Sequence, residues 1–155
     1  MLSDTDFLNV INLTPLVAID LLIKNSNGDI LLGKRNNRPA MGYWFVPGGR
    51  ILKNETFDVA FERIVKNELN QQIAWDTAKF FGCFQHLYPD NFLNSENIST
   101  HYVVLSYEIN LDTKLYNADL SEQHTEQAWW TIEDILSSEE VHPNTKAYFL
   151  SNKVE

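Results

Sequence analysis

The sequence is poor in cysteine, in positive charge and in long apolar runs. Cys83 is the one cysteine among 155 residues, so the chain cannot form an internal disulfide, and we expect it in a reducing cytoplasm. Lys and Arg number 12 against 21 Asp and Glu, which gives a formal charge of −9. This balance argues against nucleic acid as a partner, because nucleic-acid phosphates are bound by basic surfaces.

No apolar run approaches the roughly 20 residues of a membrane-spanning helix. The start, MLSDTDFLNV, has neither the basic nor the apolar region of a signal peptide. We therefore expect no membrane partner. An apolar fraction of 44% and four Trp are typical of a globular protein, and the length suits a single domain over residues 1–155 with its own core.

Apolar runs and turn signals predict a mixed α/β (α+β) fold. The run LVAIDLLIK at 16–24 predicts a buried strand, in which Asp20 is the one acid, and Asn27-Gly28 predicts a hairpin after it. Apolar residues at helical spacing predict a helix over 56–69, with Thr56 as its N-cap. Further strands are expected at 29–34, 43–46, 78–87, 100–111 and 128–131, and helical segments at 131–136 and 144–150. The strands should form a sandwich with one central helix and a C-terminal helix.

Residues 48–70, GGRILKNETFDVAFERIVKNELN, place a glycine turn before this central helix. Positions 64, 67 and 68 lie on one helix face, but Glu68 is the one acid among them. A single carboxylate with a backbone carbonyl and several waters suits one Mg²⁺. Gly48 is a natural source of that carbonyl, because glycine lets the backbone approach an ion closely. Ile64 continues the apolar stripe of the helix, so we expect it in the core.

The same segment resembles the catalytic box of the Nudix hydrolases. Four residues stand at the spacing of that box: Gly49, Glu55, Arg63 and Glu68. Ile64 and Asn67 replace two of its carboxylates, and Asn70 replaces its last glycine. The GDP-mannose mannosyl hydrolases are a Nudix subfamily whose box lacks the same carboxylates. The chain resembles them in the stretches TPLVAIDLLI, LLGKRNNRPAMGYWFVPGGR, ETFDVAFER, QHLYPDNF, THYVVL, SEQH and NTKAYFL, which span nearly its whole length.

This resemblance implies a Nudix fold and hydrolysis of GDP-mannose, with GDP-glucose as a further candidate, to GDP and the free sugar. Water would attack C1 of the sugar with inversion. The implied metal is one Mg²⁺ per site, with Mn²⁺ as a substitute, held by Gly48, Glu68 and Gln123. The implied catalytic residues are His124, Asp20, Arg35, Arg50, Arg63 and Tyr102. The implied substrate-binding residues are Arg35, Arg50, Tyr102, Asp20 and His86. His124 would be the base, since its ordinary pKa of about 6.5 suits proton abstraction near neutral pH. A homodimer is also implied.

Two other functions stay open at this point. An ordinary Nudix pyrophosphohydrolase would attack phosphorus with a base from another loop, and a catalytically inactive module would bind a nucleotide only. The residues also have structural interpretations. Glu55 is expected to form an ion pair with Arg63, and for Arg63 that role stands beside contact with the diphosphate. Three tryptophans, Trp44, Trp129 and Trp130, are expected in the core or at an interface.

Overall fold

The computed structural model describes residues 1–111 and 124–150. Its strands form one seven-stranded mixed sheet of order β3-β2-β1-β6-β5, in which β4 also pairs with β1 and β7 with β2. The pair β1–β6 is parallel and the other pairs are antiparallel. The strands are β1 (Leu16–Lys24), β2 (Ile30–Arg35), β3 (Trp44–Phe45), β4 (Gly48–Arg50), β5 (Lys79–Tyr88), β6 (Thr100–Asn110) and β7 (His124–Trp130).

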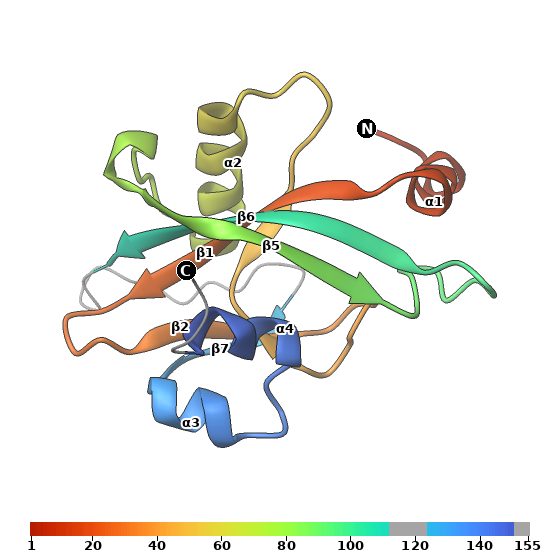
Figure 1. Ribbon diagram of the computed structural model, residues 1–155. Coiled ribbons are helices and arrows are strands. Elements are labelled where there is room, and N and C mark those ends of the chain that lie inside the picture. The colour runs from red at the N-terminus through yellow and green to blue at the C-terminus, as the bar shows by residue number, and fades with distance from the viewer. Residues whose placement is uncertain (112–123, 151–155) are drawn as a thin grey trace.

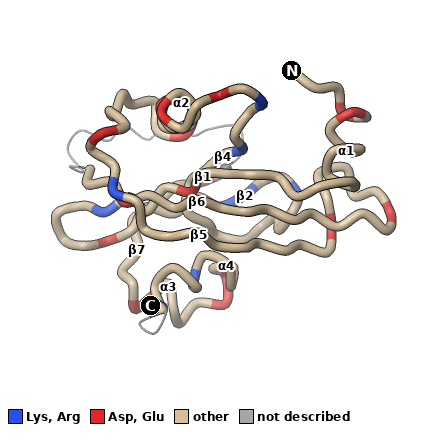
Figure 2. The backbone as a smooth tube through the Cα atoms, turned by 45° about the horizontal axis from the view of Figure 1, so that its top comes forward, with Lys and Arg blue, Asp and Glu red and all other residues tan. Residues whose placement is uncertain are grey.

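Helices cover both faces of this sheet. In two views α2 (Phe57–Leu69) lies on one face, while α3 (Ile132–Ser137) and α4 (Pro143–Lys146) lie on the other (Figures 1 and 2). Helix α1 (Asp4–Leu13) lies at one end of the sheet (Figure 1). The short helices η1 (Trp75–Thr77) and η3 (Ala147–Phe149) complete the elements. The predicted α+β class is confirmed, although the sheet lies between helical layers and does not surround α2. Within the described residues no helix is long and apolar enough to cross a membrane.

Strand β1 is apolar at every position except Asp20 and its last residue, Lys24, because both of its faces are covered. Successive side chains of a strand point to opposite faces. Leu21 and Ile23 therefore join the core under α2, whereas Leu22 joins the core under the C-terminal helices. Ile64 is 1% exposed in the first core, as predicted. Phe57 is the exception to the apolar stripe of α2, with 52% of its surface exposed.

Local polar contacts fix the turns that precede and follow these elements. Asn25 Oδ1 accepts hydrogen bonds from the backbone N–H groups of Asn27 and Asp29, each at 2.9 Å, and closes the predicted hairpin. Helix α2 begins after Thr56, whose side chain makes no capping bond. It ends at Asn70, which takes the left-handed conformation (φ 52°) and donates its N–H to the Lys66 carbonyl.

Several elements differ from the sequence-based prediction, among them β4 and η1, for which neither a strand nor a helix was predicted. Helix α1 was not predicted, although Ser3 caps it by accepting from the Asp6 N–H at 3.1 Å. Strand β7 begins at His124 and not at residue 128, because it pairs with β2 back to Arg35. The last helical segment is a single turn, α4, followed by the 3₁₀ helix η3 and not by a continuous helix to residue 150. The tighter turn accompanies the burial of Tyr148, which is 1% exposed.

Candidate active site

The site is built where β4, β1 and the end of α2 meet. Glu68 projects from α2 with 4% of its surface exposed, and its Oε1 accepts a hydrogen bond from the Gly48 N–H at 3.2 Å. Gly48 lies opposite Asp20 in the β1–β4 pair. A Cβ on Gly48 would overlap Asp20 Oδ1 and would stand 2.6 Å from the Ile19 carbonyl oxygen. Position 48 therefore needs glycine, and the two carboxylates approach it from either side.

Asp20 is held by a hydrogen-bond chain from the far end of the sequence. The Tyr148 hydroxyl donates to Asp20 Oδ2 at 2.6 Å and lies 3.4 Å from His86 Nε2. His86 and Tyr148 are both buried, at 5% and 1% exposed. The structure thus brings Asp20 and His86 together through Tyr148, a residue to which the sequence assigned no role.

Burial sets the protonation states of this chain. Desolvation raises the pKa of Asp20 to about 7, against the lowering effects of the Tyr148 hydrogen bond and the Arg35 charge, and Glu68 raises it further. Desolvation lowers the pKa of His86 to about 4, assisted by His142. The pKa of Tyr148 is raised well above its ordinary value by burial and by Asp20. At neutral pH His86 is therefore neutral, Tyr148 keeps its proton, and Asp20 titrates.

Arg35 and Arg50 stand at the ends of β2 and β4, and both act on Tyr102. Burial raises the pKa of Tyr102, and the charges of Arg35 and then Arg50 lower it. The Arg35 guanidinium lies 5.6 Å from the ring centroid of Phe45. The Arg50 guanidinium lies 4.3 Å from that of Phe7, on α1. The three predicted residues therefore surround one positively charged region next to Asp20, and stacking on aromatic rings steadies both cations.

Arg63 lies at the back of this region and holds its loop. Its Nε donates to Glu55 Oε2 at 2.7 Å, and its NH2 group donates to Glu55 Oε1 at 2.9 Å and to the Arg50 carbonyl at 2.8 Å. Glu55 Oε1 also accepts from the Leu52 N–H at 2.7 Å. The predicted Glu55–Arg63 ion pair is confirmed. Through it, Arg63 positions the backbone of Arg50.

The helix face that carries Glu68 is otherwise not acidic. Ile64 is packed against the backbone, since a Cβ on Gly49 would stand 3.0 Å from Ile64 Cγ1. Asn67, the other altered position, is exposed. Residues 1–111 and 124–150 contain no group of three or more His, Cys, Asp or Glu side chains able to hold a metal ion. The oxygen donors at Glu68 and Gly48 fit one hard cation that keeps several waters, and do not fit a cluster of cations.

The two remaining predicted residues lie at or beyond the edge of the described chain. Gln123 lies outside the described residues, and so does the side chain of His124. The backbone of His124 pairs with Arg35. Further along β7, Gln127 Nε2 donates to the Glu68 carbonyl oxygen at 3.3 Å. Strand β7 therefore runs from Arg35 toward the end of α2, and the metal-ligand and base roles of Gln123 and His124 stay predictions.

Comparison with known proteins agrees with this arrangement. A model of the NUDIX domain matches residues 14–152. The chain belongs to the Nudix family. Nudix hydrolases generally use divalent cations such as Mg²⁺ and act on nucleotide derivatives.

A curated relative and solved structures extend this match. The low-salt glycan biosynthesis protein Agl8 of Haloferax volcanii is 34% identical over 125 residues, which cover 81% of this chain and 76% of that protein. The MutT protein of Methanosarcina mazei Go1 superposes with a TM-score of 0.71 at 21% identity over 88% of this chain and 92% of its own. The MutT Nudix hydrolase of Burkholderia pseudomallei superposes with a TM-score of 0.68 at 24% identity, over 88% of this chain and 96% of its own. At these identities the two structures establish the Nudix fold alone.

Proposed function

We propose that this Nudix protein hydrolyses GDP-mannose, or the related GDP-glucose, to GDP and the free sugar by attack of water on C1 of the sugar. The observation that supports this most is the acid content of α2. The position that would carry a second carboxylate holds Ile64, 1% exposed and packed on Gly49. With Glu68 as the remaining acid of that face, the helix lacks the carboxylates that bind several cations and activate water at phosphorus in an ordinary box.

One Mg²⁺, or Mn²⁺ in its place, would be held by Glu68, the Gly48 carbonyl and Gln123. When bound, it would neutralise the charge of the leaving diphosphate. Arg35 and Arg50 add charge-assisted hydrogen bonds to the same group, and Tyr102, whose pKa is raised, keeps its proton and donates one more. Arg63 acts by holding the backbone of Arg50, because its NH2 group donates to the Arg50 carbonyl oxygen at 2.8 Å.

A diphosphate is a good leaving group, so the reaction needs no general acid of the kind that ordinary glycosidases use. It needs a base for the attacking water, and His124 fills that role from the first residue of β7. Asp20 contacts the sugar or orients the reacting groups. His86 stays neutral, since burial lowers its pKa to about 4, and it reaches Asp20 through Tyr148.

The curated relative agrees with a sugar nucleotide as substrate. As its name says, that protein acts in glycan biosynthesis. Glycans are assembled from activated sugars, and nucleoside diphosphate sugars are a common activated form.

Product identification tests the proposal. The purified protein with Mg²⁺ is incubated with GDP-mannose, GDP-glucose and other nucleoside diphosphate derivatives, and products are separated by ion-exchange chromatography. We expect GDP and free mannose or glucose. GMP with mannose 1-phosphate would identify an ordinary Nudix pyrophosphohydrolase. Binding without any product over a broad pH range would identify an inactive nucleotide-binding module.

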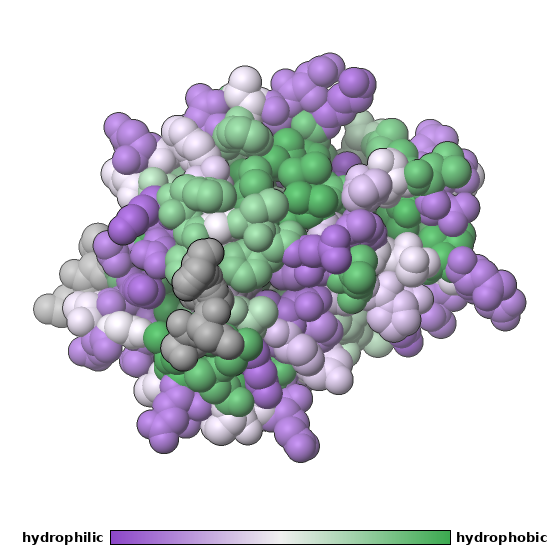
Figure 3. Space-filling view, in the orientation of Figure 1, coloured by the Kyte–Doolittle hydropathy of each residue, from purple (hydrophilic) through white to green (hydrophobic). Residues whose placement is uncertain are grey.

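We also propose a homodimer. Strand β5 is an edge of the sheet and exposes Phe80 (54%) and Leu87 (58%). Figure 3 shows apolar side chains gathered on the face of the molecule that carries β5. Covering such an edge is one way in which proteins avoid uncontrolled strand pairing. Sedimentation equilibrium at micromolar concentration would show a species of twice 17.9 kDa.

A further inference from the structure

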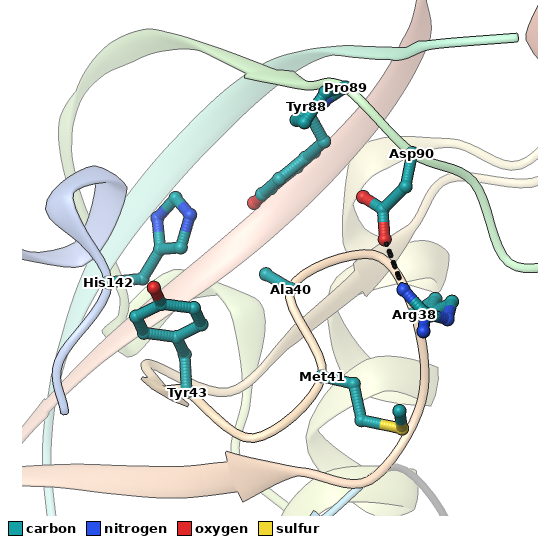
Figure 4. A pocket seen from close by; sticks show the side chains of 8 residues that line it. All are labelled: Arg38, Ala40, Met41, Tyr43, Tyr88, Pro89, Asp90 and His142. Atoms are coloured by element: carbon teal, nitrogen blue, oxygen red, sulfur yellow. Dashed lines mark hydrogen bonds and ion pairs between the residues drawn. The ribbon is translucent and has the colours of Figure 1, made fainter. Parts of the chain in front are cut away.

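A cavity of about 440 Å³ opens between the loop that carries Arg38, the end of β5 and the N-terminus of α4 (Figure 4). Arg38 and Asp90 form one side of it, and Tyr43, Tyr88 and His142 line the other. Small-molecule sites commonly have volumes of about 300–1,000 Å³ and combine aromatic walls with a few polar groups. This cavity has that size and composition.

Two series of side-chain contacts join the cavity to the predicted catalytic residues. The ring of Tyr88 lies 6.4 Å from that of His86, which reaches Asp20 through Tyr148. The ring of His142 stacks on that of Phe45, with 4.7 Å between their centroids, and the Arg35 guanidinium lies 5.6 Å from the same Phe45 centroid. The cavity is therefore on the Asp20 and Arg35 side of the site, while Glu68 lies across Gly48 from Asp20.

The ion pair in the cavity wall is not needed to hold its loops. Arg38 NH1 and Asp90 Oδ2 are 3.3 Å apart, with side chains 39% and 24% exposed. Pairs this exposed contribute about 0–1 kcal/mol to stability. The backbone of Asp90 is fixed independently, because its carbonyl accepts from the Thr100 hydroxyl at 2.7 Å. Asn91, fully buried, makes four further hydrogen bonds within the same loop.

The loop that carries Arg38 contains a left-handed residue, and its ends are joined by backbone hydrogen bonds. Ala40, which lines the cavity, has φ 60°, a left-handed conformation that costs a residue other than glycine about 1 kcal/mol or more. Hydrogen bonds at 2.9 Å tie the two ends of the loop together at Arg35: its N–H donates to the Tyr43 carbonyl and its carbonyl accepts from the Gly42 N–H. The shape of the cavity wall is thus coupled to a residue of the active site.

We propose that this cavity is the sugar subsite and that Arg38 and Asp90 select the hexose through its hydroxyl groups. The inference rests on the proposed function. If Glu68, Gly48 and the arginines hold the diphosphate, the group attached to it on the Asp20 side is the sugar. A hexose offers hydroxyls that donate to a carboxylate and accept from a guanidinium. Its apolar C–H face packs against aromatic rings such as those of Tyr88 and Tyr43, which face the cavity (Figure 4).

Separate titrations with GDP-mannose and GDP test this subsite. Asp90→Asn and Arg38→Gln are each made in a His124→Gln background, so that any turnover is slow, and dissociation constants are measured by calorimetry with Mg²⁺. We expect each variant to weaken GDP-mannose about 10- to 100-fold, as for loss of a hydrogen bond to a charged group, and to leave GDP within twofold. Glu108→Gln is the matched control, since it breaks another surface pair, Lys24–Glu108 at 3.7 Å, whose side chains are 35% and 28% exposed.

Three results would overturn the proposal. Equal weakening of GDP and GDP-mannose would place the nucleoside in the cavity. No weakening of either would make Arg38–Asp90 a contact between loops. A parent protein that binds GDP-mannose no more tightly than GDP would leave the sugar without a subsite. Failure of the proposed function gives a different pattern: the variants lose GDP-mannose binding selectively, but the wild-type protein, with His124 intact, does not hydrolyse GDP-mannose.

Discussion

Replacing Asp20 by Asn should make the folded protein more stable at alkaline pH and leave it unchanged at acid pH. Desolvation raises the pKa of Asp20 from its ordinary 3.8 to about 7. Well below pH 3.8 the carboxyl is protonated in both states and does not affect folding, and at pH 4 its effect is still small. Between pH 3.8 and about 7, the unfolded chain has lost this proton while the folded chain keeps it, and above that range both states are ionised. The folded state therefore loses stability over that window.

The pKa sets the size of this effect. One pKa unit corresponds to about 1.4 kcal/mol, so the carboxylate costs up to about 4 kcal/mol above neutral pH. Asp20 is only partly buried, so water reduces this cost, and we expect about 2–4 kcal/mol. Urea denaturation at pH 8 and pH 4 measures it. A chelator is added because a bound cation would lower the pKa of Asp20 by itself.

Asp58→Asn is the control for this experiment. Asp58 is exposed, and a hydrogen bond from the Thr56 side chain lowers the pKa of its carboxyl. Its replacement should therefore reduce stability at pH 8, the opposite sign. If Asp20→Asn is no more stable than the parent at pH 8, or gains equally at pH 4, the carboxylate is not desolvated as described and the electrostatic account of the site is wrong.

Three further substitutions test the other contacts. Tyr148→Phe removes the 2.6 Å hydrogen bond that lowers the pKa of Asp20. The pKa of Asp20 should then rise in the pH–rate profile, and kcat at pH 7 should fall about tenfold. An unchanged profile would refute the effect of Tyr148 on Asp20. Gly48→Ala forces a Cβ to within 2.6 Å of the Ile19 carbonyl oxygen, so urea denaturation should show a loss of about 1–3 kcal/mol; wild-type stability would mean that β4 can move aside. Glu55→Gln breaks the two hydrogen bonds of an ion pair that lowers the pKa of Glu55. The free energy of unfolding should fall by about 1 kcal/mol at pH 7, and by less as the pH drops below the ordinary pKa of 4.5. A loss that does not depend on pH would contradict the role of the charge.

Elements with strong local signals were predictable from the sequence. The bounds of β1 and α2 were predicted nearly to the residue from the apolar run of β1, broken only by Asp20, and from the helical spacing of α2, because each element is decided by its own burial pattern. The first residues of β7, His124 to Gln127, are polar and extend the strand only because β2 is there to pair with them. Such a strand has no local signal, since a distant partner determines it.

The same distinction holds for the site. Glu68 and the Glu55–Arg63 pair follow from fixed spacing along one loop and helix. Tyr148 lies 128 positions from Asp20 in the sequence and is brought to it only by the C-terminal layer of the fold. From the sequence alone, an aromatic residue in a terminal segment is expected to be a core residue. His142 was missed for the same reason, although it lines the cavity and its ring stacks on that of Phe45.

The position of solvent oxygen in the products tests the central claim most directly. GDP-mannose is hydrolysed with Mg²⁺ in ¹⁸O-water, and the products are analysed at once by mass spectrometry, before the free sugar exchanges its own oxygen. The account predicts ¹⁸O in the sugar and none in GDP, because water attacks carbon when α2 lacks the acids for attack at phosphorus. Label in a phosphate group, whether of GDP, GMP or mannose 1-phosphate, would contradict it.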